Sequence, residues 1–223
     1  MRLAIIIPTL NEAQHIVHCL APLQGARAEG HEVVVVDGGS DDNTQALALP
    51  FVDRVLTATR GRATQMNVGA RNATGDLLLF LHADCRVSAA AIATLTAATR
   101  GGETWGRYDV RIAGRPRVLR VVAVMMNARS RLSGIATGDQ GIFVSRVLFE
   151  RVGGFPEQPL MEDVELSRRL RALMRPLCLS ATIVTSGRRW EEHGAWRTIA
   201  LMWRLRWAYY RGADPAFLAQ RYR

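Results

Sequence analysis

The N-terminal half of the sequence alternates between short β-branched apolar runs and longer stretches with apolar side chains at helical spacing. Residues 3–7 and 32–36 are two such runs, and turn-forming residues follow each of them. Residues 12–28 have helical spacing, with Asn11 as the predicted N-cap. Because a strand, a helix and a strand in this order form a right-handed crossover, the alternation predicts buried parallel strands.

The alternation continues to residue 100 and then changes character. The further elements predicted up to there are strand 52–57, helix 62–72, strand 76–81 and helix 88–99 with Ser88 as its cap. Those predicted beyond it are a half-exposed strand 105–112, helix 117–131, strand 141–144, helix 161–174, strand 178–184 and a basic helix 196–210. We therefore expect an α/β fold, a three-layer α/β/α sandwich with a mostly parallel central sheet and a mixed C-terminal half.

Length, cysteines and charge narrow the class of protein. The 223 residues suit a single domain. Cys19, Cys85 and Cys178 match neither a metal-ligand spacing nor a disulfide framework, which favours the cytosol. The apolar run before Pro8 is too short for a signal peptide, so we expect no targeting segment. A net charge of +9 suits nucleic acid, an anionic membrane surface or a phosphorylated ligand.

Four loops that follow predicted strands carry side chains suited to a nucleotide. Because ligands of open α/β sheets bind at the carboxyl ends of the strands, these loops are expected to lie together. They offer carboxylates for a base or ribose, glycines for close backbone approach, and arginines at a helix start for phosphate. The loops are residues 8–12, 37–42, 60–65 and 82–84.

Two of these loops also fit ordinary structural roles. A tight turn capped by Asp37 and Ser40 accounts for the second loop equally well. A solvated helix start accounts for Arg60 and Arg62. Each loop taken alone therefore leaves both interpretations open.

Asp84 is the strongest candidate for a metal ligand. It follows the apolar run 77–81 after two further residues, so its carboxylate is expected at the mouth of the sheet, where it suits Mg²⁺ or Mn²⁺. A loop aspartate that caps the next turn is the alternative. His82 lies on the same side of the extended chain, and a hydrogen-bonded core histidine is its more common role.

Glu162 and Asp163 begin the predicted helix 161–174. Acidic residues in a first turn commonly compensate the helix dipole. The alternative is that one of them is a general base that takes a proton from an acceptor hydroxyl.

Taken in order, these segments resemble the GT-A family 2 glycosyltransferases. The matching segments, which cover most of the chain from Leu3 to Trp190, are residues 8–12, 35–40, 67–76, 82–84 and 162–163. Residues 61–67 and 138–143 are similar to a small bacterial subgroup described as radical-SAM/selenodomain-associated or arsenosugar-biosynthesis glycosyltransferases.

The resemblance implies a GT-A-like fold and metal-assisted transfer of a sugar, with inversion, from a nucleotide-diphosphate sugar to a small-molecule or lipid-linked acceptor. It implies that the nucleotide sugar contacts Pro8, Leu10, Asn11, Glu12, Asp37, Gly38, Gly39, Gly61, Arg62, Gln65, Asn67, His82 and Ala83. The acceptor side would comprise Gly138, Asp139, Gln140, Arg189 and Trp190. Asp163, with Glu162 beside it, would be catalytic, and Asp84 and His193 would hold Mg²⁺ or Mn²⁺.

The same resemblance divides the single domain 1–223 into functional parts. These are a nucleotide-sugar-binding half (1–100), an acceptor and catalytic half (101–190) and a basic C-terminal helical extension (191–223).

Three positions depart from the family pattern. Gly38 replaces the second aspartate of the Asp-Asp-Gly-Ser motif, and His82 replaces the first aspartate of the DxD motif. Only Arg189 and Trp190 remain of the Gln-x-x-Arg-Trp motif of processive members, which favours a single transfer.

Two other classes of function are weighed against this one. A nucleotidyltransferase would carry a glycine-rich phosphate loop after the first strand, and residues 8–12 are not such a loop. A nucleotide- or nucleic-acid-binding module suits the positive charge, but the carboxylates at the strand ends would repel phosphate, so we expect no nucleic acid partner. The basic helix 196–210 suits a homodimer, a cover over the acceptor cleft or a contact with anionic lipid. The expected location is cytoplasmic, free or peripheral at the inner membrane face.

Overall fold

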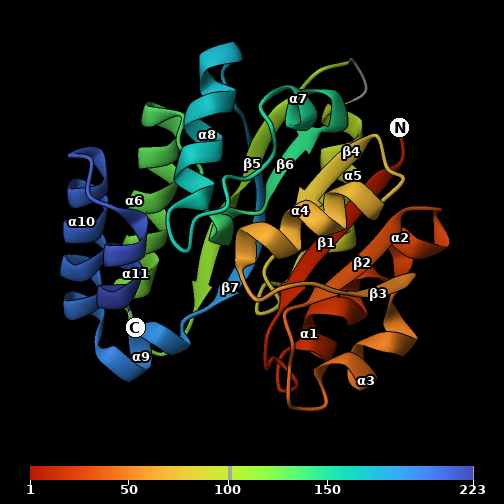
Figure 1. Cartoon of the computed structure of the whole chain (residues 1–223), viewed down its shortest axis with the longest axis horizontal. Coiled ribbons are helices and arrows are strands. Elements are labelled where there is room, and N and C mark those ends of the chain that lie inside the picture. Colours follow the sequence, from red (N-terminus) through yellow and green to blue (C-terminus); the bar gives the residue numbers. More distant parts are fainter. Residues whose placement is uncertain (100–101, 223) are drawn as a thin grey trace.

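The computed structural model describes residues 1–99 and 102–222 and shows one sheet flanked by helices (Figure 1). In this part of the chain the sheet has seven strands in the order β3-β2-β1-β4-β6-β5-β7. The strands are β1 (Leu3–Thr9), β2 (Glu32–Asp37), β3 (Arg54–Thr57), β4 (Leu77–Phe80), β5 (Trp105–Ala113), β6 (Ile142–Ser145) and β7 (Leu177–Ser186).

Strand directions decide where the loops gather. Strands β1 to β4 are parallel to one another, β6 runs antiparallel to β4 and β5, and β7 is parallel to β5. The loops that follow β1, β2 and β4 therefore emerge at one edge of the sheet. The expected mostly parallel sheet is confirmed, with β6 as its antiparallel member.

Helices cover both faces of the sheet. The α-helices are α1 (Ile16–Leu20), α2 (Gln24–Ala28), α3 (Thr44–Ala48), α4 (Arg62–Asn72), α5 (Ala89–Ala98), α6 (Val118–Ser133), α7 (Arg146–Arg151), α8 (Glu162–Leu173), α9 (Arg188–His193), α10 (Ala195–Tyr210) and α11 (Pro215–Tyr222). Short 3₁₀ turns are η1 (Ala21–Leu23), η2 (Leu49–Phe51) and η3 (Gly138–Gln140).

The strand sequences explain this three-layer arrangement. Ile5 and Ile7 pack with α1, α2 and α5 on one face, whereas Ala4 and Ile6 pack with α4, α7 and α8 on the other. Because successive side chains of a strand point to opposite faces, a sheet covered on both sides requires uninterrupted apolar runs. The expected α/β/α sandwich is thereby confirmed.

The C-terminal helices form a separate wall beside α6 (Figure 1). Ile199 of α10 packs against Leu119 and Val122 of α6. Further along α10, Leu205 packs with Met161 at the start of α8 and with residues of α11. The basic extension is thus part of the folded body next to α8.

Strand β5 alternates in burial, as its sequence predicts, only over residues 109–113, whereas residues 105–108 are all buried. Trp105, Arg107 and Tyr108 are all fully buried. The reason is that both faces are covered here: Trp105 packs in the core with α4, α7 and α8, and Tyr108 packs in the core with α1, α2 and α5. Buried Arg107 forms an ion pair with Asp109 and donates to the Asn127 carbonyl, while its Nε has no hydrogen-bond partner among the described residues.

The long helix predicted over residues 12–28 is broken in the structure. It begins at Ile16, passes through the 3₁₀ turn η1 and resumes as α2. Pro22 in η1 has no N–H to continue a regular helix. Asn11 is therefore not an N-cap; it lies in a loop with φ 55°.

Substitution of Gly106 by alanine is expected to destabilise the protein by about 3 kcal/mol, because the new methyl group has no space. A Cβ at this position would lie 1.9 Å from the Leu177 carbonyl oxygen of β7, and backbone cannot rotate aside. Gly25, with no heavy atom within 4 Å of its added Cβ, is the control, and Gly25→Ala should be neutral or stabilising. Urea unfolding followed by circular dichroism measures both; equal stability of the two variants would contradict this.

Candidate functional site

The loops after β1 and β2 are tied together by side-chain hydrogen bonds. The Asn11 N–H donates to Ser40 Oγ (2.9 Å), and the Glu12 N–H donates to Thr44 Oγ1 (2.8 Å). In return, the Asp41 N–H donates to Asn11 Oδ1 (3.0 Å). These contacts hold Asn11 in its left-handed conformation, which asparagine tolerates better than most residues.

Asp37 organises its own loop. Its Oδ2 accepts from the Gly39 and Ser40 N–H groups and from Gln45, and its Oδ1 accepts from Thr9 and Ser40 hydroxyls. Burial raises the pKa of Asp37, but these hydrogen bonds outweigh burial and lower the pKa below its usual value. Because the carboxylate is already saturated with donors, its contact with a nucleotide stays a prediction.

Gln65 also has a structural role that its sequence context did not suggest. Its buried side-chain amide donates to the Thr9 and Val36 carbonyls at 2.7 and 2.8 Å and so joins α4 to the ends of β1 and β2. A Cβ on Gly38 would meet this amide at 3.0 Å. The side chain of Gln65 therefore takes the space next to Gly38, where the family pattern has an aspartate.

Asn67 is likewise engaged by the protein itself. Its amide nitrogen donates to the Phe155 carbonyl (2.8 Å), and its amide oxygen accepts the Phe155 N–H (2.9 Å). The side chain is buried and clamps the loop before α8. Gln65 and Asn67 thus build the walls of the site, in contrast to the direct ligand contacts expected of them.

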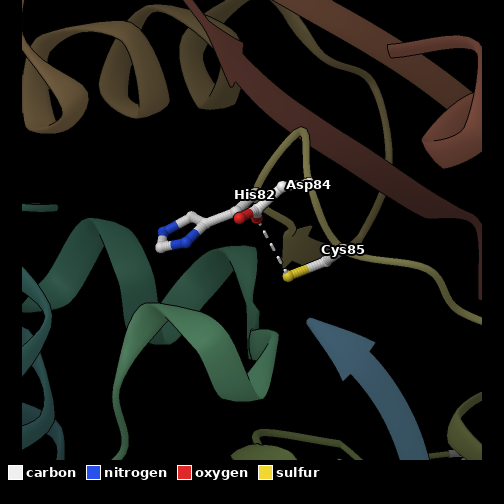
Figure 2. A group of neighbouring side chains, drawn as sticks. All are labelled: His82, Asp84 and Cys85. Atoms are coloured by element: carbon white, nitrogen blue, oxygen red, sulfur yellow. Dashed lines mark hydrogen bonds between the residues drawn. The ribbon is translucent and has the colours of Figure 1, made fainter. Parts of the chain in front are cut away.

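His82, Asp84 and Cys85 lie close together after β4 (Figure 2). Each offers a ligand atom, and these atoms all lie within 4.8 Å of one another. Burial, followed by the charge of Asp84, raises the pKa of the Cys85 thiol well above its usual value, so it stays protonated and is a poor ligand for a hard cation. The Asp84 carboxylate and the His82 imidazole remain as fitting ligands for Mn²⁺, and the carboxylate alone for Mg²⁺.

Glu12 adds a second carboxylate to this end of the sheet. Its Oε2 is buried and has no hydrogen-bond partner among the described residues. Burial raises the pKa of Glu12, the charge of Arg188 lowers it and the charge of Asp84 raises it again. A cation between the two carboxylates would relieve this repulsion, so the residues present fit a divalent metal. His193 is exposed at the end of α9 and lies outside the group around Asp84.

Asp163 is held rigidly at the start of α8. Its Oδ2 accepts the Gly138 N–H at 2.8 Å, and its Oδ1 accepts the Val164 N–H at 2.7 Å. Met161, two residues before Asp163, has φ 65°, a strained conformation for a residue other than glycine. Each carboxylate oxygen keeps a lone pair that could accept a proton.

Glu162 and Arg62 form an ion pair across the site, with 3.4 Å between Oε1 and Nη1. Glu162 is buried, and burial raises its pKa while the charge of Arg62 lowers it. Arg62 keeps 47% of its side-chain surface exposed although α8, α11 and η3 supply charged and polar groups around it. It is therefore accessible to a ligand from solvent.

Asp139 and His82 connect the turn η3, which is predicted to face the acceptor, with the end of β4. Their Oδ1 and Nδ1 atoms are 3.4 Å apart. Burial raises the pKa of Asp139, but the hydrogen bond and charge of His82 and the charge of Arg62 outweigh it and lower the pKa. A Cβ added to Gly138 would lie 2.3 Å from His82 Nε2, so a larger residue here would displace the imidazole. Gln140 is buried and bonded to Ser130, so it supports this turn instead of facing the site.

A small cavity marks the centre of these groups. It has a volume of about 10 Å³, room for about one water-sized sphere. Its lining comprises Met66, Phe80, His82, Gly138, Ile142, Phe155, Glu162 and Asp163. The tertiary structure therefore brings the β4 end, η3 and the start of α8 to one point.

Arg189 and Trp190 lie in α9 and face different partners. The Arg189 guanidinium lies 3.7 Å from the centre of the Tyr222 ring and also donates to the Tyr222 carbonyl. Tyr222 of α11 is a candidate site residue that the sequence analysis missed. The charges of Arg62 and Asp163 both act on its hydroxyl group. Trp190 lines an open groove of about 490 Å³ with Val118 and Trp196, among others.

The fold places the chain in a structural class. TarS of Staphylococcus aureus in complex with UDP-GlcNAc superposes with a TM-score of 0.68 at 22% identity, over 83% of this chain and 58% of that one. The mannosyltransferase PcManGT of Pyrobaculum calidifontis, in complex with GDP-Man and Mn²⁺, has a TM-score of 0.63 at 26% identity, over 82% and 56% of the two chains. The chain has the GT-A glycosyltransferase fold.

The sequence comparisons identify the family. The family model described as glycosyl transferase family 2 matches residues 4–131, more than half of the chain. The chain therefore belongs to glycosyl transferase family 2.

Named relatives match parts of this family region. A PGL/p-HBAD biosynthesis glycosyltransferase of Mycobacterium bovis is 40% identical over 36% of this chain and 34% of its own length. Glycosyltransferase AglE of Haloferax volcanii is 33% identical over 37% of this chain and 30% of its own length. The alignments thus span about a third of these relatives. In residues 1–99 and 102–222, no helix is both long and apolar enough to cross a membrane.

Proposed function

We propose that this chain transfers a sugar from a nucleotide-diphosphate sugar to an acceptor hydroxyl by a single displacement with inversion. The observation that carries the proposal is the convergence of Asp84, Arg62 and Asp163 on one edge of a GT-A sheet, linked through His82, Asp139 and Gly138. Both complexes named above contain a nucleotide sugar, which supports the donor class.

Asp163 is the proposed general base. The acceptor hydroxyl attacks the anomeric carbon opposite the diphosphate, and Asp163 takes the hydroxyl proton. The new C–O bond forms as the bond to the diphosphate oxygen breaks, and the nucleoside diphosphate leaves with the electron pair. The two backbone N–H groups that bind Asp163 keep its carboxylate oriented toward that proton.

Asp84 and His82 would hold the divalent cation, with Glu12 close by. Such a cation would neutralise negative charge on the diphosphate. Arg62 is placed to contribute a further positive charge to the leaving group. His193, whose side chain is exposed at the end of α9, stays a proposed further ligand.

The finer features of the proposal rest on the sequence motifs. A single, non-processive transfer follows from the partial Arg189-Trp190 motif, whose arginine is covered by Tyr222. The division into donor half, acceptor half and C-terminal extension and the arsenosugar-type subgroup also remain proposals. The names of the relatives described above do not mention that subgroup.

The exposed side chains of α10 are the basis for the proposed cellular location and partners. Helix α10 exposes Trp196, Trp203, Trp207 and Tyr210 along one stripe. Arginines flank this stripe, and no acidic residue occurs in α10. Aromatic side chains with flanking arginines suit the surface of an anionic bilayer, so a cytoplasmic chain that is peripheral at the inner membrane face is proposed over a homodimer.

A panel of UDP, GDP, CDP and dTDP, each with and without Mn²⁺ or Mg²⁺, tests the donor class by thermal shift. At least one diphosphate is expected to stabilise the protein in a metal-dependent way. A concentration about 100-fold above Kd stabilises by about 2.7 kcal/mol, which raises Tm by about 5 to 10 °C for a chain of this size. If none of the four nucleotides raises Tm with either metal, the proposed donor class is wrong.

A further inference from the structure

Two arginines beside the candidate base have no assigned role. Arg129 lies in α6 and Arg206 in α10. In residues 1–99 and 102–222, the Nε and Nη2 atoms of Arg129 are buried and have no hydrogen-bond partner. Within the same residues, neither guanidinium forms an ion pair with a carboxylate. A buried cation without a partner is costly, so its retention requires an explanation.

The neighbouring contacts place Arg129 next to the reaction centre. Ser130, the next residue of α6, accepts a hydrogen bond from Gln140 Nε2 at 3.0 Å. Gln140 ends the turn that begins at Gly138, whose N–H binds Asp163. The α6 turn that carries Arg129 therefore adjoins both the acceptor-side turn and the candidate base.

Helix α10 brings Arg206 to the same place. Its neighbour Leu205 packs with Met161 and Val164 at the start of α8. Burial and the charge of Arg206 lower the pKa of Arg129, the charge of Asp163 raises it, and the net pKa is about 10. The charges of Arg206 and Asp163 thus both act on the Arg129 guanidinium.

Within the described residues the nearby carboxylates form no ion pair with either arginine, although the charge of Asp163 acts on Arg129 and that of Asp139 on Arg206. Asp163 is bonded to the N–H groups of Gly138 and Val164, and Asp139 is paired with His82. A ligand that carries two negative charges and several acceptor oxygens would satisfy both guanidinium groups together. Phosphate has this charge and geometry, and arginine binds it through paired N–H groups.

We propose that Arg129 and Arg206 bind a phosphate group carried by the acceptor, next to Asp163. This inference rests on the proposed glycosyl transfer and narrows its acceptor to a phosphorylated molecule. The donor diphosphate is expected elsewhere, at Asp84 and Arg62. With its phosphate fixed by α6 and α10, the acceptor can present a hydroxyl to Asp163.

The test measures binding of inorganic phosphate and glycerol 3-phosphate by thermal shift and calorimetry at constant ionic strength, with glycerol as the uncharged control. Both phosphates are expected to bind the wild type. Arg129→Met and Arg206→Gln should each weaken binding at least about 10-fold. Arg120→Gln on α6 and Arg197→Gln on α10, both at exposed positions, are the matched controls and should bind phosphate as the wild type does.

Stability of the unliganded variants provides a second readout. Arg129→Met removes a buried charge without a partner, so its Tm should equal or exceed that of the wild type. A strong loss of stability would mean that the guanidinium is paired in solution and would overturn the proposal. Arg206→Gln, at a half-buried position, supplies an independent measurement of phosphate binding.

The outcomes separate this inference from the proposed function. Phosphate binding that persists in both arginine variants would contradict this inference but not the proposed function. Loss of nucleoside diphosphate binding in Arg129→Met would also contradict it, because the site would then belong to the donor. A protein that binds phosphate but none of the four nucleotides sinks the proposed function. Hexyl phosphate distinguishes the source of the group: tighter binding than glycerol 3-phosphate indicates a lipid carrier, and equal binding indicates a soluble acceptor.

Discussion

Asp163→Asn is expected to lower kcat by about 10² to 10⁴, the usual contribution of a general base. Asparagine is nearly isosteric and keeps an oxygen for the Gly138 N–H, which Asp163 accepts at 2.8 Å. Its amide cannot take the proton of an acceptor hydroxyl. Nucleotide affinity should stay close to the wild-type value, because the proposed donor site lies at the ends of β1, β2 and β4. Steady-state turnover and a nucleotide titration measure the two quantities.

Glu165→Gln is the matched control, since Glu165 lies on the same turn of α8 but faces Arg168 and Arg169. It should leave kcat nearly unchanged. Glu162→Gln tests the neighbouring carboxylate, which is buried and paired with Arg62. If Asp163→Asn turns over normally while Glu162→Gln does not, the base is Glu162 and the assignment given above is wrong.

Asp84→Asn is expected to abolish metal-dependent nucleotide binding and to lower kcat/KM by at least about 10²-fold. The carboxylate is the hard ligand of the His82, Asp84 and Cys85 group, and an amide carries no charge to hold a cation. The effect should appear in the thermal shift with Mn²⁺ and vanish without metal.

Asp76→Asn is the control for this variant, because Asp76 lies at the opposite end of the same strand and accepts the Arg2 N–H. It should bind nucleotide and metal as the wild type does. His82→Ala should give an intermediate loss with Mn²⁺ and a smaller one with Mg²⁺, which prefers oxygen ligands. Unchanged Mn²⁺-dependent binding in Asp84→Asn would contradict the metal assignment.

Much of the fold could be predicted because local periodicity encodes it. Helix α4 spans Arg62–Asn72, as its apolar spacing predicts, and Ser88 caps α5 by accepting the Ala91 N–H. Gathering of the strand-end loops at one edge follows from parallel strands alone. Short helices such as α3, α7 and α11 were missed because they are held by tertiary packing more than by their own pattern.

The roles of individual polar side chains could be predicted less well. Gln65 and Asn67 looked suited to a ligand, but their amides bind backbone groups 56 and 88 residues away. The sequence predicted Asn11 as a helix cap, but its N–H donates to Ser40 Oγ and its side-chain oxygen accepts the Asp41 N–H. Such partners are set by three-dimensional proximity, which one sequence does not display.

The sequence by itself determined the layered sheet, the edge at which chemistry gathers and the candidate residues Asp84 and Asp163 in their family motifs. The tertiary structure alone decided which polar groups are already hydrogen-bonded and which remain free for a ligand. It placed Arg129, Arg206 and Tyr222 beside the site from helices far along the chain. The physical reason is that hydrogen-bond satisfaction and burial depend on the groups packed around a side chain, whereas periodicity depends only on its neighbours in sequence.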